Sequence, residues 1–157
     1  MNYWLMKSEP STFGIDDLAR AKQRTTRWDG VRNYQARNFL RDEMKKGELA
    51  FFYHSSCPVP GIAGIVKIVR EGYPDRTAFD AKDDHYDAES DPRKPRWYSV
   101  DVQLERKFDE VVTLETLRSH SKGALKEMVL LKRGNRLSIT PVTKQEWTFI
   151  TSLVRSA

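Results

Sequence analysis

Three segments in the middle of the chain carry the pattern of β-strands, and they indicate a fold built around a sheet. Residues 49–54 form a short apolar run, and residues 62–71 are rich in β-branched side chains. The loop between them is rich in Ser, Pro and Gly, so the sequence predicts a hairpin over 49–71. Residues 97–108 alternate, with apolar side chains at even positions from 98 to 104 and polar side chains at odd positions from 99 to 105.

Shorter elements surround these strands. The sequence predicts further strands over 3–6 and 138–142, a polar loop over 22–27, and helices over 13–21, 33–45, 113–119, 124–129 and 143–154. Ser11 or Thr12 is expected to cap the first helix, and Thr143 with Glu146 to form a capping box for the last. These elements predict an α+β fold, with a small curved sheet or barrel and short helices in a single domain over 1–157.

The stretch 72–96 is too long for an ordinary connection between strands. It contains three prolines and many carboxylates, and the sequence predicts one helical turn near Thr77 within a loop that packs as a cover. The acidic run has neither the spacing nor the glycine of a calcium loop. We therefore expect its carboxylates to be solvated.

Composition excludes several classes of protein. With 157 residues the chain can bury a hydrophobic core without the help of disulfides or structural metals. A single cysteine, Cys57, excludes a disulfide framework or a cysteine-based zinc cluster. No apolar run approaches the roughly 18 residues of a membrane span, and the first residues lack a signal-peptide pattern. Glycine-rich phosphate loops are absent from the sequence. We expect a soluble, cytoplasmic protein without metal, cofactor or membrane partner.

The net charge of +5 is unevenly distributed along the chain. Residues 1–47 carry +4, residues 48–117 carry −5, and residues 118–157 carry +6. A basic surface is typical of nucleic-acid binding. A net charge of this size can also serve only to keep a small domain soluble. It therefore supports a nucleic-acid-binding function only where the basic residues surround a binding site.

Residues 28–33 (Trp-Asp-Gly-Val-Arg-Asn) combine side chains that suit recognition of a nucleobase. Trp28 offers a stacking plane, Asp29 an acceptor for an exocyclic amine, and Asn33 both a donor and an acceptor. The alternative is that Trp28 packs on the core while Asp29 caps a helix. The sequence leaves the two interpretations equal.

Trp97 shares its predicted strand face with polar side chains, and a large apolar indole on an otherwise polar face requires an explanation. Either the 72–96 loop folds over it, or it forms a wall for a planar ligand. In the second case a base stacked on it would gain about 1–3 kcal/mol.

The end of the 49–54 strand carries the polar run Tyr53-His54-Ser55, followed by Cys57. A histidine beside Ser or Cys can activate a nucleophile, but the spacing matches no nucleophile motif. We expect His54 and Ser55 to be hydrogen-bonding groups that line a pocket at the strand end, and no residue is predicted to be catalytic.

Arg37, Arg41 and Lys45 recur every four residues and share one face of the predicted 33–45 helix. With the neighbouring basic residues of 20–32 they form either a phosphate-binding patch or the solvated face of the helix.

Longer stretches of sequence resemble the EVE domain family. These stretches are residues 3–10 (YWLMKSEP), 28–40 (WDGVRNYQARNFL), 51–55 (FFYHS), 60–64 (PGIAG), 95–98 (PRWY) and 128–138 (MVLLKRGNRLS). The resemblance covers essentially the whole chain. It implies a PUA-like fold, a small bent β-barrel surrounded by short helices, similar to YTH and SRA/ASCH-type readers of modified bases.

The function implied by this resemblance is non-catalytic binding of DNA or RNA that carries a modified base, flipped into an aromatic pocket. Trp28 would form one wall of the pocket and Tyr53 or Trp97 the other. The hydrogen-bonding residues would be Ser8, Asp29, Asn33, His54 and Ser55, and the phosphate-binding residues Lys7, Arg32 and Arg37. A DNA-binding protein of this kind would be associated with the nucleoid.

Two other classes of function stay open at this point. One is a small enzyme that acts on a modified nucleobase or nucleoside, with His54 paired with Asp29 or Cys57. The other is a protein-interaction domain that uses the acidic 72–96 stretch.

Overall fold

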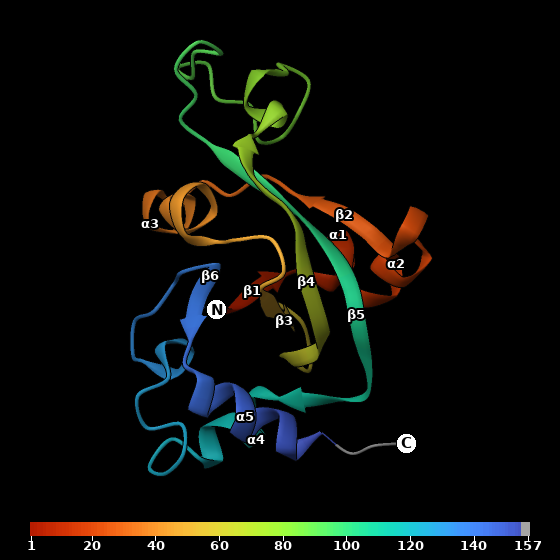
Figure 1. Cartoon of the computed structure of the whole chain (residues 1–157), viewed down its shortest axis with the longest axis vertical. Coiled ribbons are helices and arrows are strands. Elements are labelled where there is room, and N and C mark those ends of the chain that lie inside the picture. Colours follow the sequence, from red (N-terminus) through yellow and green to blue (C-terminus); the bar gives the residue numbers. More distant parts are fainter. Residues whose placement is uncertain (155–157) are drawn as a thin grey trace.

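The computed structural model describes residues 1–154 and is built around a six-stranded mixed sheet (Figure 1). Its strand order is β2-β5-β4-β3-β1-β6, in which β1 and β3 are parallel and the other neighbours antiparallel. The strands are β1 (Tyr3–Ser8), β2 (Thr25–Trp28), β3 (Leu49–His54), β4 (Gly61–Pro74), β5 (Tyr98–Thr113) and β6 (Ile139–Val142).

Short helices lie around the sheet. The α-helices are α1 (Pro10–Phe13), α2 (Ile15–Arg20), α3 (Tyr34–Asn38), α4 (Leu114–Ser119) and α5 (Lys144–Leu153). Single turns of other helix types are η1 (Lys22–Arg24), η2 (Phe39–Glu43), η3 (Arg76–Phe79) and η4 (Val129–Leu131). None of the helices within residues 1–154 is both long and apolar enough to cross a membrane.

The sheet is strongly bent because its two longest strands are irregular. The pairing of β4 with β5 shifts register at four places, and such bulges bend and twist the strands. At Gly64 a side chain would collide with the backbone carbonyl oxygen of Arg106, so only glycine permits this close approach. Within the described residues β2 and β6 are unpaired edges. The α+β, PUA-like class is thus confirmed, with the barrel open between these two strands.

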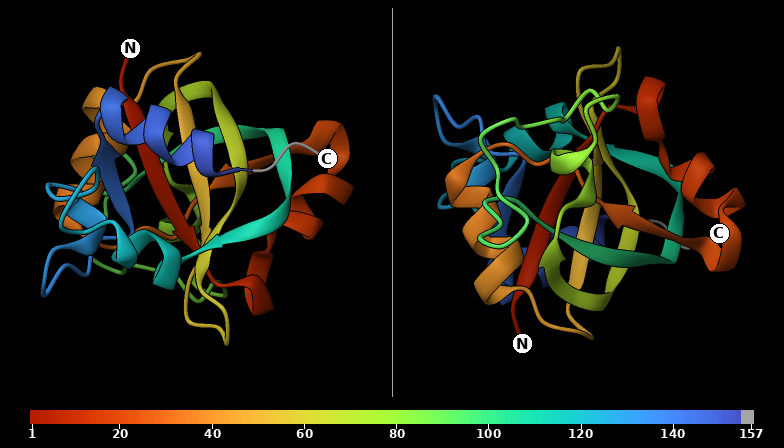
Figure 2. Two further views of the ribbon diagram at one scale, coloured as in Figure 1. Left: turned by 90° about the horizontal axis from the view of Figure 1, so that it is seen from below. Right: turned by 90° about the horizontal axis from the view of Figure 1, so that it is seen from above.

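Each face of the bent sheet covers its own apolar core. Side chains alternate between the two cores along β3: Phe52 packs in one, which we call the first core, while Phe51 and Tyr53 pack in the other, the second core. Helix α5 lies across the strands on the second face (Figure 2, left), and its Trp147 stacks on Phe51 and Tyr3, at 3.9 Å and 4.7 Å between ring centroids.

Most predicted elements are confirmed. The 49–71 hairpin is present as β3 and β4, and the alternating segment is β5. Thr143 and Glu146 form the capping box of α5. Thr77 lies in the helical turn η3.

Four predictions of local structure are wrong. The expected loop 22–27 contains β2, whose polar residues suit an edge strand because it pairs only with β5. The expected helix over 13–21 is interrupted, since Phe13 ends α1, Gly14 is extended and α2 begins at Ile15. Neither Ser11 nor Thr12 is a cap, because both lie within α1, whose N-cap is Glu9. The expected helix over 124–129 is absent: residues 124–127 form turns, and Val129 begins the single turn η4.

The predicted helix over 33–45 is present in altered form. Asn33 caps α3, but the helix widens into the π-turn η2 at Phe39 and ends before Met44. This shorter helix places Leu40 and Met44 in the first core.

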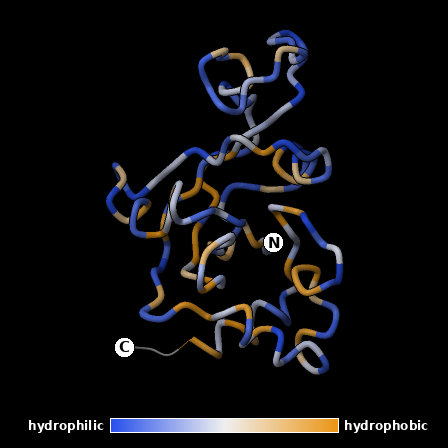
Figure 3. Tube along the Cα trace, turned by 180° about the vertical axis from the view of Figure 1, so that it is seen from behind, coloured by the Kyte–Doolittle hydropathy of each residue, from blue (hydrophilic) through white to orange (hydrophobic). Residues whose placement is uncertain are grey.

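The segment between β4 and β5, residues 75–97, projects from the top of the molecule and is largely hydrophilic (Figures 1 and 3). It folds back on itself, and the carboxylate of Asp87 accepts a hydrogen bond of 2.7 Å from the Trp97 indole. The buried Asp75 lies at its start, and its carboxylate accepts a hydrogen bond from the backbone N–H of Gly30, in the segment after β2. The 75–97 segment therefore packs as a cover.

Candidate functional site

A cleft of about 780 Å³ opens where β1 and β2 end, and we call it the main cleft. Its walls come from the ends of these strands, from α1, from the segment after β2, and from the 75–97 segment. The lining residues are Lys7, Ser8, Glu9, Thr12, Phe13, Thr26, Arg27, Trp28, Asp29, Gly30, Val31, Arg32, Asn33, His85 and Ser138. Six residues predicted from sequence meet here: Lys7, Ser8, Trp28, Asp29, Arg32 and Asn33.

Trp28 is both a core residue and part of the cleft. The residue is 8% exposed, and its ring contacts Phe52 edge-on at 5.5 Å between centroids. The same indole lines the main cleft. Packing of Trp28 on the core is therefore confirmed, but Asp29 does not cap the helix, since Asn33 is the N-cap of α3. Only a small part of the Trp28 ring is available to a ligand, and its stacking role stays a prediction.

Asp29 and Lys7 are half-buried ionisable groups in the same cleft. Burial raises the pKa of Asp29, and the nearby Asp75 carboxylate raises it further. Burial lowers the pKa of Lys7. Neither side chain forms an ion pair or hydrogen bond with another residue of 1–154, so this pair presents an unpaired acceptor and an unpaired donor to the cleft.

Ser8 and Asn33 are partly engaged in holding the local structure. The Ser8 hydroxyl donates to the carbonyl of Phe13 at 2.6 Å, which leaves its oxygen as an acceptor. The Asn33 side-chain oxygen accepts from the backbone N–H of Ala36 at 3.0 Å. Its amide nitrogen forms no hydrogen bond within the described chain, and Asn33 is exposed.

Arg32 lines the main cleft, but its guanidinium is already saturated. Its five N–H groups are directed at the Asp75 carboxylate, the Thr77 hydroxyl, the Val31 carbonyl and, twice, the His85 carbonyl. An arginine has five donors, so none remains for a phosphate. The predicted phosphate-binding role of Arg32 is therefore replaced by a structural role: Arg32 ties the 75–97 segment to the wall of the cleft.

Asp75 is the fully buried partner in this contact. Burial by itself would raise its pKa, but hydrogen bonds from Thr77, the Gly30 backbone N–H and Arg32 outweigh burial and lower it. The carboxylate is therefore held in its charged form. It fixes the backbone of Gly30, which has a φ of +78° and lies against the ring of His85.

Tyr53, His54 and Ser55 do not line the main cleft. Tyr53 points to the second core because neighbouring β3 residues alternate in direction, and the ring behind Trp28 is Phe52 instead. The His54 ring accepts a hydrogen bond of 3.1 Å from the backbone N–H of Ile15 at the start of α2, and burial lowers its pKa. Ser55 donates its backbone N–H to the carbonyl of Ser8.

Trp97 also lies outside the main cleft. It is 7% exposed beneath the 75–97 segment, and Tyr34 stacks on it at 5.0 Å between ring centroids. Of the two sequence interpretations, the one in which the loop covers Trp97 is confirmed.

Arg37 borders a separate hollow on the other side of α3. Its guanidinium donates to the carbonyl of Arg96 at 2.6 Å and to the Asn38 side chain at 2.8 Å. Three of its five N–H groups stay free for other partners.

The structure adds cleft residues that were not predicted as site residues. Phe13 and Ser138 approach from α1 and from the residue before β6, and His85 from the 75–97 segment. Arg27 was noted in the sequence only as one of several basic neighbours, and its place in β2 directs it to the cleft. No local pattern marks His85, since its position depends on how a long segment folds back.

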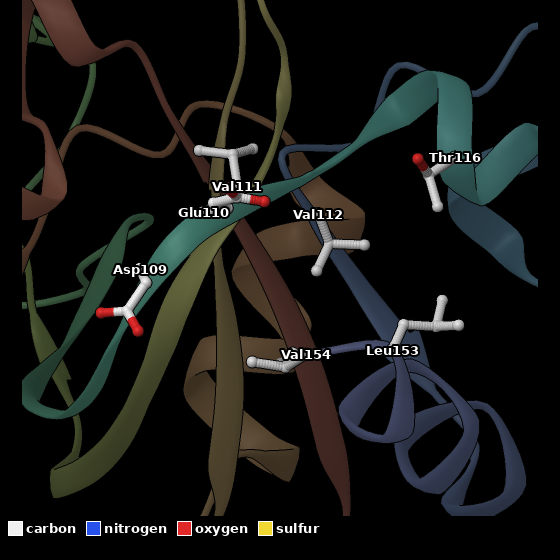
Figure 4. Close-up of a pocket in the computed structure, with 7 residues that line it drawn as sticks. All are labelled: Asp109, Glu110, Val111, Val112, Thr116, Leu153 and Val154. Atoms are coloured by element: carbon white, nitrogen blue, oxygen red, sulfur yellow. The ribbon is translucent and has the colours of Figure 1, made fainter. Parts of the chain in front are cut away.

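A further hollow of about 310 Å³ lies between β5 and the end of α5 (Figure 4). Val112, Leu153 and Val154 border it on one side, with the Asp109 carboxylate at its rim. It contains none of the residues predicted from sequence as a site. No group of three or more His, Cys, Asp or Glu side chains in residues 1–154 is placed to hold a metal ion.

Comparison with known proteins gives one consistent family. The EVE domain model matches residues 2–153. Human thymocyte nuclear protein 1 is 50% identical over an alignment of 167 positions, which covers 97% of this chain and 73% of that protein.

Solved structures give the same result. The human THYN1 protein in complex with 5-methylcytosine containing DNA superimposes with a TM-score of 0.93 at 49% identity, covering 98% of this chain and 97% of that one. A protein from Pseudomonas syringae has a TM-score of 0.90 at 50% identity, with 96% and 98% covered. The chain therefore belongs to the EVE domain family.

Proposed function

We propose that this protein binds DNA containing a modified cytosine, and that the main cleft receives the modified base. The observation that carries the proposal is the unpaired Asp29 carboxylate beside Trp28 in a cleft that also holds the unpaired Lys7 amine. Its volume of about 780 Å³ is within the range of ligand pockets. The choice of 5-methylcytosine follows the related human protein, whose structure contains DNA with that base.

The cleft residues supply complementary chemistry for such a base. The Asp29 carboxylate accepts from the exocyclic amine of cytosine, as carboxylates do in direct base readout. Phe13 and Val31 offer apolar surface to the methyl group, and the exposed part of Trp28 contacts the ring. These contacts together offset the few kcal/mol needed to flip a base out of its stack.

The remaining polar groups position the strand around the base. Lys7 donates to a phosphate or to a base acceptor, and the free amide nitrogen of Asn33 donates at the opposite rim. Arg27 is exposed at the same cleft and adds a second cation. Tyr53 and Trp97 take no part in this proposal, since both are buried elsewhere.

The test compares two duplexes that differ only in the 5-methyl group, titrated against the protein by fluorescence anisotropy. We expect tighter binding to the methylated duplex. Asp29→Asn removes the acceptor for the exocyclic amine, which both cytosines carry, and is expected to weaken binding to the methylated duplex by about 10-fold or more for one charge-assisted hydrogen bond. Asp109→Asn, at an exposed site on the distant end of β5, makes the same charge change and is expected to keep the wild-type affinity.

Equal affinity of the wild-type protein for both duplexes would reject methylation reading. Wild-type affinity of Asp29→Asn for the methylated duplex would place the residue that reads the exocyclic amine elsewhere. An RNA oligonucleotide with and without the same modification extends the titration to the RNA-binding prediction. The single-domain organisation and the cytoplasmic or nucleoid location remain predictions.

A further inference from the structure

A second basic hollow, which we call the α3 groove, lies beside the main cleft. It has a volume of about 450 Å³. It is lined by Tyr34, Arg37, Arg41, Glu89, Asp91, Lys94, Pro95 and Arg96. Four cations from two separate parts of the chain face it, against two carboxylates.

The α3 groove and the main cleft share a wall. Asn33 lines the cleft and the next residue, Tyr34, lines the groove, so the two hollows adjoin within one residue of backbone. Behind this wall the rings of Tyr34 and Trp97 stack, and the saturated guanidinium of Arg32 lies 5.3 Å from the Trp97 centroid. A strand that enters the cleft from this side must pass along the groove.

The cationic side chains of the α3 groove keep N–H donors available for a ligand. Arg41 contacts the exposed Asp42 through two N–H groups, which leaves three free. Lys94 is exposed and forms no ion pair with a described carboxylate. Arg96 reaches Asp87 and Glu89 only at 3.4 Å and 3.5 Å, near the limit of a hydrogen bond.

The groove is also held in shape. The guanidinium of Arg37 donates across it to the carbonyl of Arg96, which joins α3 to the 75–97 segment. Tyr34 is 54% exposed but is fixed by its stack on the buried Trp97. Cations on a preformed surface lose less conformational entropy when they bind than cations on free side chains.

We propose that the α3 groove binds the phosphodiester backbone of the DNA strand whose modified base occupies the main cleft. This inference rests on the proposed function, since it takes the path of the strand from the base in the cleft. The chemistry fits because arginine forks and a free lysine are the groups that bind phosphate oxygens. Phosphate contacts of this kind add affinity but carry no sequence information.

The experiment measures the salt dependence of binding for Arg41→Ala, Lys94→Ala and the double variant, on methylated and unmodified duplexes. Each lost phosphate contact is expected to lower the slope of log K against log salt by about 1. Affinity should fall by the same factor for both duplexes, so that discrimination is kept. Lys122→Ala removes one exposed cation that follows α4, at the other end of the molecule, and is expected to leave the slope unchanged (Figure 1).

The outcomes separate the two proposals. If the double variant keeps the wild-type slope while the protein still discriminates methylated DNA, the groove proposal is wrong and the proposed function stands. If the slope falls but the wild-type protein does not discriminate, the groove binds backbone and base reading is wrong. An equal fall for Lys122→Ala would show a general charge effect and overturn the groove.

Discussion

The Arg32 guanidinium lies 3.0 Å from a carboxylate oxygen of Asp75, which is fully buried. This contact joins the wall of the main cleft to the start of the 75–97 segment. The same carboxylate accepts from the Gly30 backbone and from both the backbone N–H and the hydroxyl of Thr77. One buried acid thus organises the loop that carries Asp29.

Removal of this acid is expected to unfold the cleft wall. Asp75→Asn cannot accept at both oxygens, and breaking a buried pair by loss of one partner costs about 3–5 kcal/mol in the free energy of unfolding. Urea denaturation measures the loss. Arg41→Lys, in the exposed pair with Asp42, is the control and is expected to leave the urea midpoint unchanged. A loss of similar size in both variants would contradict the structural role of Asp75.

Asp29→Asn is expected to stabilise the protein while it impairs binding. Burial raises the pKa of Asp29, so the folded state favours the neutral acid, and ionisation at neutral pH destabilises it. That destabilisation is absent below the ordinary carboxyl pKa of 3.8 and fully present above the raised pKa. Thermal denaturation should therefore show a higher melting temperature for the variant at neutral pH and no difference in strong acid. A lower melting temperature at neutral pH would contradict this account.

His54 is expected to weaken the fold as the pH falls. Burial lowers its pKa, so its neutral form is favoured, and that form accepts from the Ile15 backbone N–H. The resulting stability is fully present above the ordinary histidine pKa of 6.5 and is lost as the pH falls through the lowered value. Urea denaturation just below pH 6.5, where ordinary carboxylates are still ionised, detects the loss.

Two matched variants test whether His54 is the source of this pH dependence. Gln can accept through its side-chain oxygen without titrating, so His54→Gln should flatten the stability profile in this pH range. His120→Gln, at a partly buried edge-on contact with Phe149, should keep the wild-type profile. The account of His54 fails if His120→Gln is the variant that removes the pH dependence.

Gly30 and Gly134 form a matched pair of left-handed glycines. Their φ angles are +78° and +77°, but a side chain at Gly30 would collide with the His85 ring, whereas none of the described atoms lies within 4 Å at Gly134. Substitution by Ala costs about 1–2 kcal/mol at either site for the backbone alone. Gly30→Ala should lose more stability than Gly134→Ala and should weaken DNA binding, as measured by denaturation and anisotropy. Equal stability losses would show that His85 moves aside freely.

Local patterns in the sequence were sufficient for the long strands and for the cap of α5. Alternation over 98–105 and the capping box at Thr143 depend only on nearby residues, and both are confirmed. The edge strand β2 was missed because its four residues carry little apolar signal and are ordered by pairing with β5, about 75 residues later. The break at Gly14 was missed because His54, on a distant strand, supplies the acceptor that starts a new helix at Ile15.

The composition of the candidate site divides in the same way. The sequence by itself determined that Trp28, Asp29 and Asn33 lie together, because they are neighbours on one short segment, and its motifs determined the family. Only the tertiary structure decided that Phe52, not Tyr53, lies behind Trp28, because one residue of strand register reverses the direction of a side chain. It likewise decided that Arg32 is bound within the protein, because its partner Asp75 lies 43 residues away in the sequence and is brought near only when β2 and the end of β4 both pair with β5.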